Sequence, residues 1–291
     1  YSDIIDYITL PSTGDAADFG DLITANSYRN NGNGSSVSRA MLAGGGGNPA
    51  KAKYVDKVTF STTGDGADWG DLVTERFDFA GTTNGVKGFF GGGYDGRVDV
   101  IETATIATDG TSADFGDLLA ANYGVTGANS QTRGIFAGGN VANGSPYRVN
   151  VIQYITFSTA GNAVDFGNLT QTAQGKGGCS NNRTALFAGG NNPTKTATTD
   201  YITIASTGDA GDFGDLNGTA TGGAMISNFT RGVHGGGATP SLSNVLDYFN
   251  FSTAGNATDF GDLTAARSGV GCACSSGGGL ESFDPSIRFA P

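Results

Sequence analysis

Six copies of an Asp-aromatic-Gly triplet recur along the whole chain. The aromatic residue of each copy is Phe or Trp, at positions 19, 69, 115, 166, 213 and 260, so neighbouring copies are 46 to 51 residues apart. A period of this length is typical of folds in which one supersecondary unit is repeated around an axis or along a line. The triplet therefore predicts a repeat architecture, and we expect residues 1–291 to form a single domain.

Each unit contains patterns for four short strands, which we label a to d in chain order. Ile4 to Leu10 alternates apolar and polar residues and predicts a c strand, and Ala17 to Leu22 predicts the d strand after a turn. Arg39 to Ala43 predicts a b strand that ends at a run of glycines, with an a strand in the polar stretch before it. Four strands per unit of this length predict an all-β propeller, because a β-helix has a shorter coil.

The order of the strands along the chain indicates how the ring should close. Six c–d pairs are visible, but only five clear a–b pairs lie between them. Gly269 to Ser276 can supply the missing a strand and Ser286 to Ala290 a degenerate b strand, next to the hairpin at Ile4 to Leu22. We therefore predict a six-bladed β-propeller of four-stranded blades, with the ring closed by pairing of the N- and C-terminal segments, which hides the edge strands.

Charge and hydropathy exclude two classes of partner. The chain carries 16 Lys and Arg residues against 27 Asp and Glu residues, a net charge of −11, so the phosphate backbone of a nucleic acid would be repelled. We expect no membrane insertion and no secretion leader, because the chain has no run of about 18 apolar residues and no charged segment followed by an apolar one. The sequence begins at Tyr1 rather than Met, and we expect it to be a segment of a longer protein.

Paired aspartates accompany five of the six triplets. The pairs are Asp18/Asp21, Asp68/Asp71, Asp114/Asp117, Asp212/Asp215 and Asp259/Asp262, and Asn168 replaces the second Asp after Asp165. A catalytic pair is needed only once, so the repetition favours carboxylates that accept hydrogen bonds from turn amides or pair with a repeated base. That base stands just ahead of or at the start of each clear b strand, at Arg39, Lys87, Arg133, Arg183 and Arg231. Binding of Ca²⁺ through the carboxylate oxygens is the alternative.

Residues that commonly act in catalysis are few. His234, the only histidine, stands where three other repeats have Phe, so we expect a core residue, and a Ser-His-Asp triad has no other histidine to use. Cys179, Cys272 and Cys274 lack the spacing of a zinc site, and we expect small buried residues, with a disulfide between Cys272 and Cys274 as the alternative. We predict no catalytic residue, no metal site and no cofactor.

The loops between strands b and c, and those between strands d and a, differ from repeat to repeat, whereas the turn between c and d hardly varies. In a propeller the two variable loop classes emerge on the same face, and loops on a rigid scaffold commonly carry binding sites. Aromatic residues and Arg are favoured at contact surfaces. The candidate ligand-binding residues in these loops are Tyr28, Arg29, Phe77, Tyr94, Tyr123, Tyr147 and Arg148. The alternative is that they are solvent-exposed loop residues without a partner.

The repeat unit resembles two known groups of proteins. The Gly-Gly end of b strands such as RGIFAGG at Arg133, the c strand VIQYITF at Val151 and the d-strand aromatic resemble a Kelch-type propeller blade, in which the d-strand aromatic is usually the Trp that only Trp69 keeps here. The segment DYITIASTGDAGDFGDL at Asp200 more closely resembles glycine-rich repeats of virion and tail-fibre proteins from marine bacteriophages of cyanobacteria and similar hosts. This resemblance implies a virion or extracellular location and other virion or fibre proteins as partners.

These features favour a non-enzymatic virion structural or adhesion module, part of a tail fibre or capsid appendage, whose loops bind a host-surface glycan or a virion protein. A polysaccharide-acting hydrolase or lyase on a propeller scaffold is the alternative, and it would need Asp, Glu and Arg converging at the channel mouth. A third hypothesis is pure assembly, in which one face packs on other subunits and touches no ligand. Because propellers carry unrelated activities, the site rather than the fold must decide between them.

Overall fold

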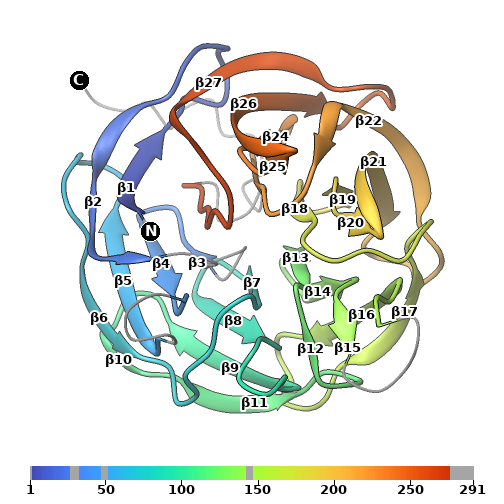
Figure 1. Ribbon diagram of the computed structural model, residues 1–291. Helices are drawn as coiled ribbons and strands as arrows, with labels where there is room; N and C mark the ends of the chain where they lie inside the picture. The colour runs from blue at the N-terminus through green and yellow to red at the C-terminus, as the bar shows by residue number, and fades with distance from the viewer. Residues whose placement is uncertain (1, 27–32, 47–51, 142–146, 276–291) are drawn as a thin grey trace.

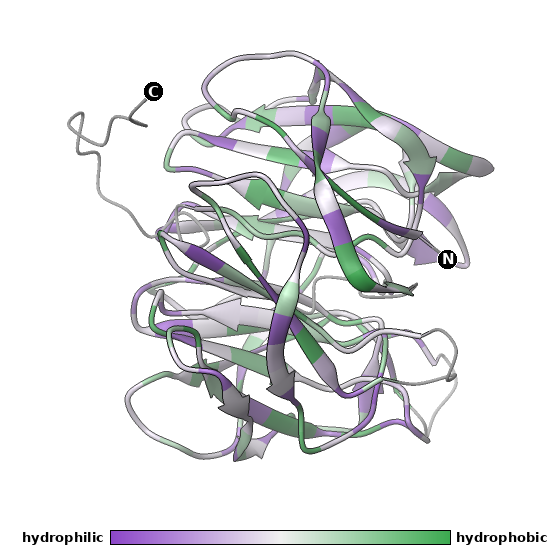
Figure 2. Ribbon diagram, turned by 90° about the vertical axis from the view of Figure 1, so that its left-hand side faces the viewer, coloured by the Kyte–Doolittle hydropathy of each residue, from purple (hydrophilic) through white to green (hydrophobic). Residues whose placement is uncertain are grey.

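The computed structural model describes residues 2–26, 33–46, 52–141 and 147–275. These residues form strands and no helix, and their sheets stand around a common centre as the blades of a β-propeller (Figure 1). Seen from the side, apolar and polar residues are interleaved along the strands of each sheet (Figure 2). The predicted all-β propeller architecture is therefore confirmed.

Five sheets share a plan of four antiparallel strands that follow one another from the centre outwards. The first blade consists of β3 (Asn33–Ser35), β4 (Arg39–Ala43), β5 (Tyr54–Thr59) and β6 (Ala67–Asp71). The second consists of β7 (Ala80–Thr83), β8 (Lys87–Gly91), β9 (Val100–Thr105) and β11 (Ala113–Asp117). The third consists of β13 (Thr126–Asn129), β14 (Arg133–Ala137), β16 (Val151–Thr156) and β17 (Val164–Asn168).

The last two blades repeat this plan with longer outer strands. The fourth consists of β18 (Gly177–Ser180), β19 (Thr184–Ala188), β21 (Thr194–Thr203) and β22 (Gly211–Ala220). The fifth consists of β23 (Ala224–Ser227), β24 (Arg231–Gly235), β26 (Ser241–Asn250) and β27 (Thr258–Arg267). Strands of two residues also lie beside the blades: β10 (Gly110–Thr111), β12 (Asn122–Tyr123), β15 (Asn140–Val141), β20 (Asn191–Asn192) and β25 (Ala238–Thr239).

The Asp-aromatic-Gly triplet lies on the outer strand of each unit, where neighbouring sheets meet. The ring of Phe115 meets Phe89 edge-on, with 5.0 Å between centroids, and Phe89 stacks on Phe157 of the next blade at 4.5 Å. The triplet glycine has a positive φ, 153° at Gly116, and a Cβ on Gly116 would lie 2.3 Å from the carbonyl oxygen of Gly161 in the next turn. The triplet forms the contact between one sheet and the next, and this contact explains why it recurs in every repeat.

The turn after each c strand is tied to the outer strand of the preceding sheet. Gly161 N donates to Phe115 O at 2.8 Å, and Asn162 Oδ1 accepts a hydrogen bond from Asp117 N at 3.1 Å. The side chains that accept the equivalent bond in other sheets are Asp15, Asp65, Asp209 and Asn256. Triplet aspartates themselves accept from the glycine of their own strand, as Asp68 does from Gly70 N at 2.9 Å. The prediction that the paired aspartates accept hydrogen bonds from turn amides is therefore wrong for Asp68 and Asp212, which accept from an amide of their own strand. The acceptors that tie turn to strand are residues of the turns themselves.

An acidic or amide side chain on each of five c strands forms a second tie between sheets. These residues accept hydrogen bonds from backbone amides at the end of the preceding d strand. The pairs are Asp6 with Thr264, Glu102 with Val73 and Thr74, Gln153 with Leu119, Asp200 with Thr170, and Asp247 with Asn217. Each of these carboxylates or amides therefore helps to hold neighbouring sheets together.

Basic side chains alternate between two positions along the ring. In the first, third and fifth blades, Arg39, Arg133 and Arg231 donate to backbone carbonyls of the following sheet's turn. Between these positions lie three ion pairs made by basic residues at or after the end of a d strand, namely Arg76 with Glu102, Lys176 with Asp200 and Arg267 with Asp6. The predicted Arg–Asp ladder is therefore wrong for the three b-strand arginines, because stacking over a c-strand Tyr ring, seen for Arg133 and Arg231, directs the guanidinium to the turn.

The predicted count of six four-stranded blades is wrong, because the amino-terminal repeat contributes only the two-stranded sheet of β1 (Ser2–Tyr7) and β2 (Ala17–Asn26). The segment expected as its a strand forms no strand in the described part, up to residue 275, and the expected b strand, Ser286 to Ala290, lies outside the described residues. In the other sheets an a strand obtains its ladder hydrogen bonds from the b strand beside it. The segment at Gly269 to Ser276 has no b strand beside it among the described residues.

The amino-terminal hairpin lies between the fifth and first blades (Figure 1). Gly14 N donates to Phe260 O at 2.8 Å and Ala16 N to Asp262 O at 2.7 Å, as the equivalent turn amides do between other neighbouring sheets. On its other side, Gly64 N donates to Phe19 O at 2.7 Å. The hairpin therefore makes the same sheet-to-sheet contacts as the outer half of a complete blade.

Candidate functional site

The d–a and b–c loops form a repeated ladder on one face of the propeller, as the strand order predicts. In each of four successive blades, a residue of the loop that enters the blade pairs in antiparallel fashion with a residue just after strand b. These pairs are Phe77 with Tyr94, Tyr123 with Asn140, Gln174 with Asn191, and Thr221 with Ala238. In the last three blades a third residue continues the ladder, and it is Arg148, Lys195 and Leu242 respectively. The backbone of this face is regular, whereas its side chains change from blade to blade.

An aromatic cluster occupies the ladder of the second and third blades. The ring centroids of Phe77 and Tyr94 are 5.3 Å apart, and those of Tyr94 and Tyr123 are also 5.3 Å apart. The guanidinium of Arg97 lies over the ring of Tyr123, 5.2 Å from its centroid. Tyr94 is 39% exposed, so the cluster combines packed rings with a surface that a ligand can reach.

The structure thus brings together three of the seven predicted binding residues, Phe77, Tyr94 and Tyr123. Arg148 joins them through the ladder, because Asn140 pairs with Tyr123 on one side and with Arg148 on the other. Tyr147 lies next to Arg148 and is 57% exposed. The remaining two predicted residues, Tyr28 and Arg29, lie outside the described residues.

Arg97 is a site residue that the sequence reasoning missed. It stands in the b–c loop of the second blade, in the segment RVDVI, and Arg148 stands in the matching segment RVNVI of the third blade. The amide after each arginine closes the same loop, since Val98 N donates to Gly93 O and Val149 N to Gly139 O, both at 3.1 Å. Alignment of these two segments within the chain would have identified Arg97 together with Arg148.

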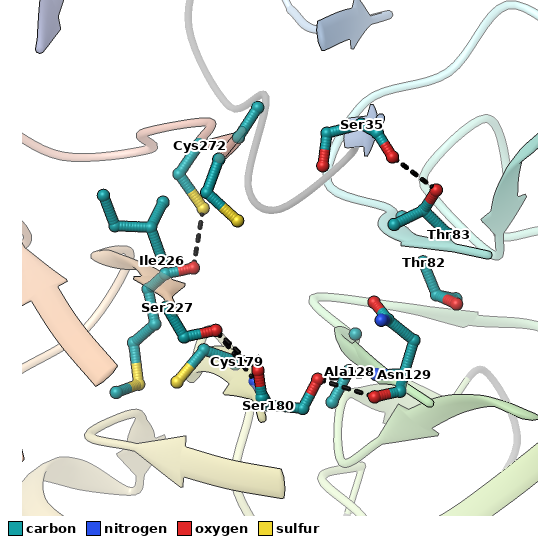
Figure 3. A pocket seen from close by; sticks show the side chains of 16 residues that line it. Ser35, Thr82, Thr83, Ala128, Asn129, Cys179, Ser180, Ile226, Ser227 and Cys272 are labelled. Atoms are coloured by element: carbon teal, nitrogen blue, oxygen red, sulfur yellow. Dashed lines mark hydrogen bonds between the residues drawn. The ribbon is translucent and has the colours of Figure 1, made fainter. Parts of the chain in front are cut away.

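The centre of the propeller holds only a small cavity, of about 60 Å³, lined by the innermost strands and by Cys272 to Cys274 (Figure 3). Hydroxyl groups link neighbouring strands around it: Ser180 Oγ donates to Asn129 O and Ser227 Oγ to Ser180 O, both at 2.7 Å. Ligand sites for small molecules usually measure about 300–1,000 Å³. The cavity is therefore too small for a sugar ring, and the hydroxyl groups around it hold the inner strands together.

Three thiols, of Cys179, Cys272 and Cys274, line one side of this cavity, and none of them is part of a disulfide. Burial raises the pKa of Cys272 to about 12 and that of Cys179 well above its ordinary value, so both are protonated thiols at neutral pH. Cys272 Sγ donates to Met225 O at 2.9 Å. The predicted burial is confirmed for Cys179 and Cys274, and Cys272 is half-buried.

His234 is buried in β24, as its place in the repeat predicts. Burial lowers its pKa to about 4, so the imidazole is neutral at physiological pH. It faces Gly177 and Gly223, where an added Cβ would lie 3.1 and 2.4 Å from the ring. His234 is therefore a packed core residue with no access to a substrate.

The buried carboxylates are used by the scaffold. Glu102 accepts hydrogen bonds from two backbone amides and pairs with Arg76, whose guanidinium also donates to three carbonyl oxygens. Asp200 pairs with Lys176 at 3.0 Å in the same way. Within the described ranges, no three His, Cys, Asp or Glu side chains are grouped so that they could hold a metal ion.

The comparisons leave the chain without an assigned family. No model of a known protein family matches the sequence, and no curated protein matches it significantly. No helix in the part of the chain that the structure describes is long and apolar enough to cross a membrane. The loop face with its aromatic cluster is therefore identified from geometry alone.

Proposed function

We propose that this chain is a non-enzymatic recognition module whose loop face binds a ligand through the aromatic cluster of Phe77, Tyr94 and Tyr123. The observation that carries the proposal is the contrast between the constant ladder backbone and its changing side chains, with aromatic rings gathered at one place on it. Aromatic rings contribute large contact areas at little cost in side-chain entropy, and they dominate the energetics of many binding surfaces.

A host-surface glycan is the ligand that we propose, on a virion or tail-fibre protein of a bacteriophage. The likeness of the repeats to virion and tail-fibre repeats supports this setting, together with other virion or fibre proteins as neighbours. An exposed ring such as that of Tyr94 offers an apolar plane on which a sugar can pack. A Kelch-like origin of the blade is part of the same proposal.

Two observations favour binding over the alternative of a polysaccharide hydrolase or lyase. Glycoside hydrolysis ordinarily needs two carboxyl groups that face one substrate. The buried acids Glu102 and Asp200 instead accept hydrogen bonds from backbone amides and pair with Arg76 and Lys176. In addition, the central cavity of about 60 Å³ has no room for a substrate.

The test is binding of the protein to a glycan array and to intact cyanobacterial cells, before and after substitution of Tyr94 by Ala. Loss of one packed aromatic anchor is expected to weaken binding by about 2 kcal/mol or more, roughly 30-fold. The matched control is Tyr201→Ala, because Tyr201 is 37% exposed against 39% for Tyr94 and also packs edge-on against an aromatic ring, but lies on a c strand near the opposite face. Binding that survives Tyr94→Ala, or is lost equally in both variants, would contradict the proposal.

We infer further that the C-terminal segment closes the ring by lying on the inner side of the two-stranded amino-terminal hairpin. Two observations support this inference. Ile4 and Tyr7 of β1 are 40% and 44% exposed, on a strand whose equivalents in the five blades pair with a b strand. Gly269 N donates to Gly222 O at 2.7 Å, which repeats the bond of Gly222 N to Gly175 O, so the chain enters the centre at the next position of the ring.

A further inference from the structure

Two arginines on the loop face occupy equivalent backbone positions of adjacent blades. Arg97 and Arg148 both stand in the b–c loop of their blade, and the same backbone hydrogen bond fixes each loop. Both side chains are half-buried rather than extended into solvent. This placement differs from that of the exposed cation Lys87, which stands at the start of a b strand.

The Nε atom of each of these arginines is buried without a hydrogen-bond partner. An unsatisfied buried donor costs about 1–3 kcal/mol, so native proteins usually pair such groups. The arginines on the opposite face show the usual situation, since Arg133 donates to Ile204 O at 2.9 Å and to Ala205 O at 3.2 Å. Arg97 and Arg148 therefore have hydrogen-bonding capacity that the described protein groups do not use.

Tyr123 lies between the two arginines. Its ring is under the guanidinium of Arg97, and its backbone pairs with Asn140, which pairs in turn with Arg148. Directly paired residues of antiparallel strands point their side chains to the same side, and two strand spacings measure about 10 Å. The guanidinium of Arg97 thus lies over the Tyr123 ring, and the backbone of Arg148 lies two strand spacings from that of Tyr123 in the same ladder.

The backbone of Arg97 is held in a strained conformation. Its φ is 64°, a region that costs a residue with a Cβ about 1 kcal/mol or more and that Gly adopts freely. Asp78, which directly follows Phe77 of the aromatic cluster, also has a positive φ, of 58°. Strain of this kind is commonly retained where it positions a side chain for a function.

The surrounding charges indicate directed recognition rather than general attraction of anions. The whole chain has a net charge of −11, Asp95 belongs to the b–c loop of Arg97, and Asp78 belongs to the d–a loop that precedes the same blade. A polyanion would therefore gain little from long-range attraction. A single anionic group could instead accept the paired N–H donors of a guanidinium, a geometry that matches carboxylate and sulfate oxygens.

From this geometry we infer that Arg97, Tyr123 and Arg148 form a subsite for an acidic sugar, whose carboxylate or sulfate accepts hydrogen bonds from the two guanidinium groups beside the aromatic cluster. This inference rests on the proposed glycan-binding function. It specifies the chemical class of the ligand and assigns a role to Arg97, which links the aromatic cluster to Arg148.

The test compares hexuronate and sulfated oligosaccharides with their methyl-esterified and desulfated forms, by calorimetry with the full chain. We expect the acidic forms to bind at least tenfold more tightly than the neutral forms. A preference for hexuronates over their methyl esters indicates a carboxylate ligand, and a preference for sulfated over desulfated sugars indicates a sulfate ligand. Arg97→Gln and Arg148→Gln should each weaken binding of the acidic form about ten- to hundredfold, as expected for one charge-assisted hydrogen-bond site. Lys87→Gln, with the same change in charge on an exposed residue of the opposite face, should leave binding unchanged.

Arg97→Gly separates a binding role from a structural one. This variant should unfold at the same temperature as the parent or at a higher one, because Gly relieves the positive φ, and it should still lose affinity for the acidic sugar. Equal binding of acidic and neutral forms that requires Tyr94 but neither arginine would overturn the acidic subsite and leave glycan binding standing. Absence of binding to every acidic and neutral sugar would overturn both proposals.

Discussion

His234 is a single residue whose protonation is coupled to the stability of the fold. Its pKa is about 4 in the folded chain, against 6.5 when exposed, because burial disfavours the charged imidazolium. Above pH 6.5 it contributes no pH dependence. As the pH falls from 6.5 to 4, the unfolded chain takes up a proton that the folded chain does not, so the free energy of unfolding should fall by about 3 kcal/mol in total.

Urea unfolding at several pH values between 4 and 8 measures this effect, and His234→Phe is the control, because Phe occupies the equivalent position in three other repeats. Asp247 pairs with His234 across the sheet, and burial raises the pKa of its carboxyl. Its contribution therefore has the opposite sign, and it is present in both proteins. The difference between parent and variant isolates His234. If the two proteins lose stability in parallel between pH 6.5 and 4, the imidazole is not buried in its neutral form.

Single residues also mark the limit of what the sequence could predict. The repeated position of His234 predicted its burial, because a position that is Phe in other units is a core position. Glu102 and Asp200 were not singled out, although an acidic or amide residue recurs at this place in the c strands. The backbone amides that donate to these carboxylates come from another repeat about 30 residues away, so only the folded chain shows the contact.

At the scale of the strand, the glycine of the triplet can be tested by a matched pair of substitutions. In Gly214→Ala the new Cβ would lie 2.3 Å from the carbonyl oxygen of Gly255, in the turn of the next sheet. In Gly208→Ala the Cβ has nothing within 4 Å, although its φ of 154° is close to the 142° of Gly214. We expect Gly214→Ala to lower the free energy of unfolding by about 1–3 kcal/mol more than Gly208→Ala, as for an overpacked contact.

Thermal or urea unfolding of the two variants measures this difference. Because both glycines have similar positive φ values, the backbone strain of Ala is nearly the same in the two positions and cancels in the comparison. Equal losses of stability would mean that the close approach between sheets is not what requires glycine in the triplet. The same comparison can be repeated with Gly167 and Gly161, which have the same contrast in surroundings.

The sequence predicted the b, c and d strands better than the last a strand, because an a strand depends on hydrogen bonds from its b neighbour. The b, c and d strands have strong local patterns, and their expected places, such as Arg39 to Ala43 for β4, agree with the structure. The segment at Gly269 to Ser276 has the spacing of an a strand and reaches the centre, but it forms no strand within its described residues. An a strand has little apolar pattern of its own and depends on its b neighbour for pairing.

The molecule as a whole repeats most closely in units of two sheets. Arg39, Arg133 and Arg231 donate to the turn of the sheet that follows, and the ion pairs of Arg76, Lys176 and Arg267 occur between these positions. The alternation continues through the amino-terminal hairpin, since Arg231 reaches Leu10 O and Arg267 pairs with Asp6. The hairpin therefore receives the same contacts from basic side chains as the second and fourth blades do. It takes part in the alternation although it is not a complete blade.

Closure of the ring leads to a prediction about the C-terminal segment. Ala273 packs in the same apolar cluster as Phe19, Leu42 and Val58, between the hairpin and the first blade. Deletion of residues 269–291 removes this contact and should lower the free energy of unfolding by about 2 kcal/mol or more, which corresponds to about 4–8 °C in the unfolding temperature. Hydrogen exchange should show the earliest loss of protection in β1 and β2, because their inner side is then uncovered.

A shorter deletion, of residues 276–291, separates the two parts of the segment inferred to close the ring. It keeps Ala273 and the thiols at the central cavity, and it removes the segment expected to pair with β1. If that segment is the b strand, amides of β1 should exchange faster while those of β2 keep the protection they obtain from β1. Unchanged exchange in β1 would show that residues 276–291 do not pair with it. A protein without residues 269–291 that is as heat-stable as the full chain would contradict closure itself, because the hairpin would then be held by the fifth and first blades alone.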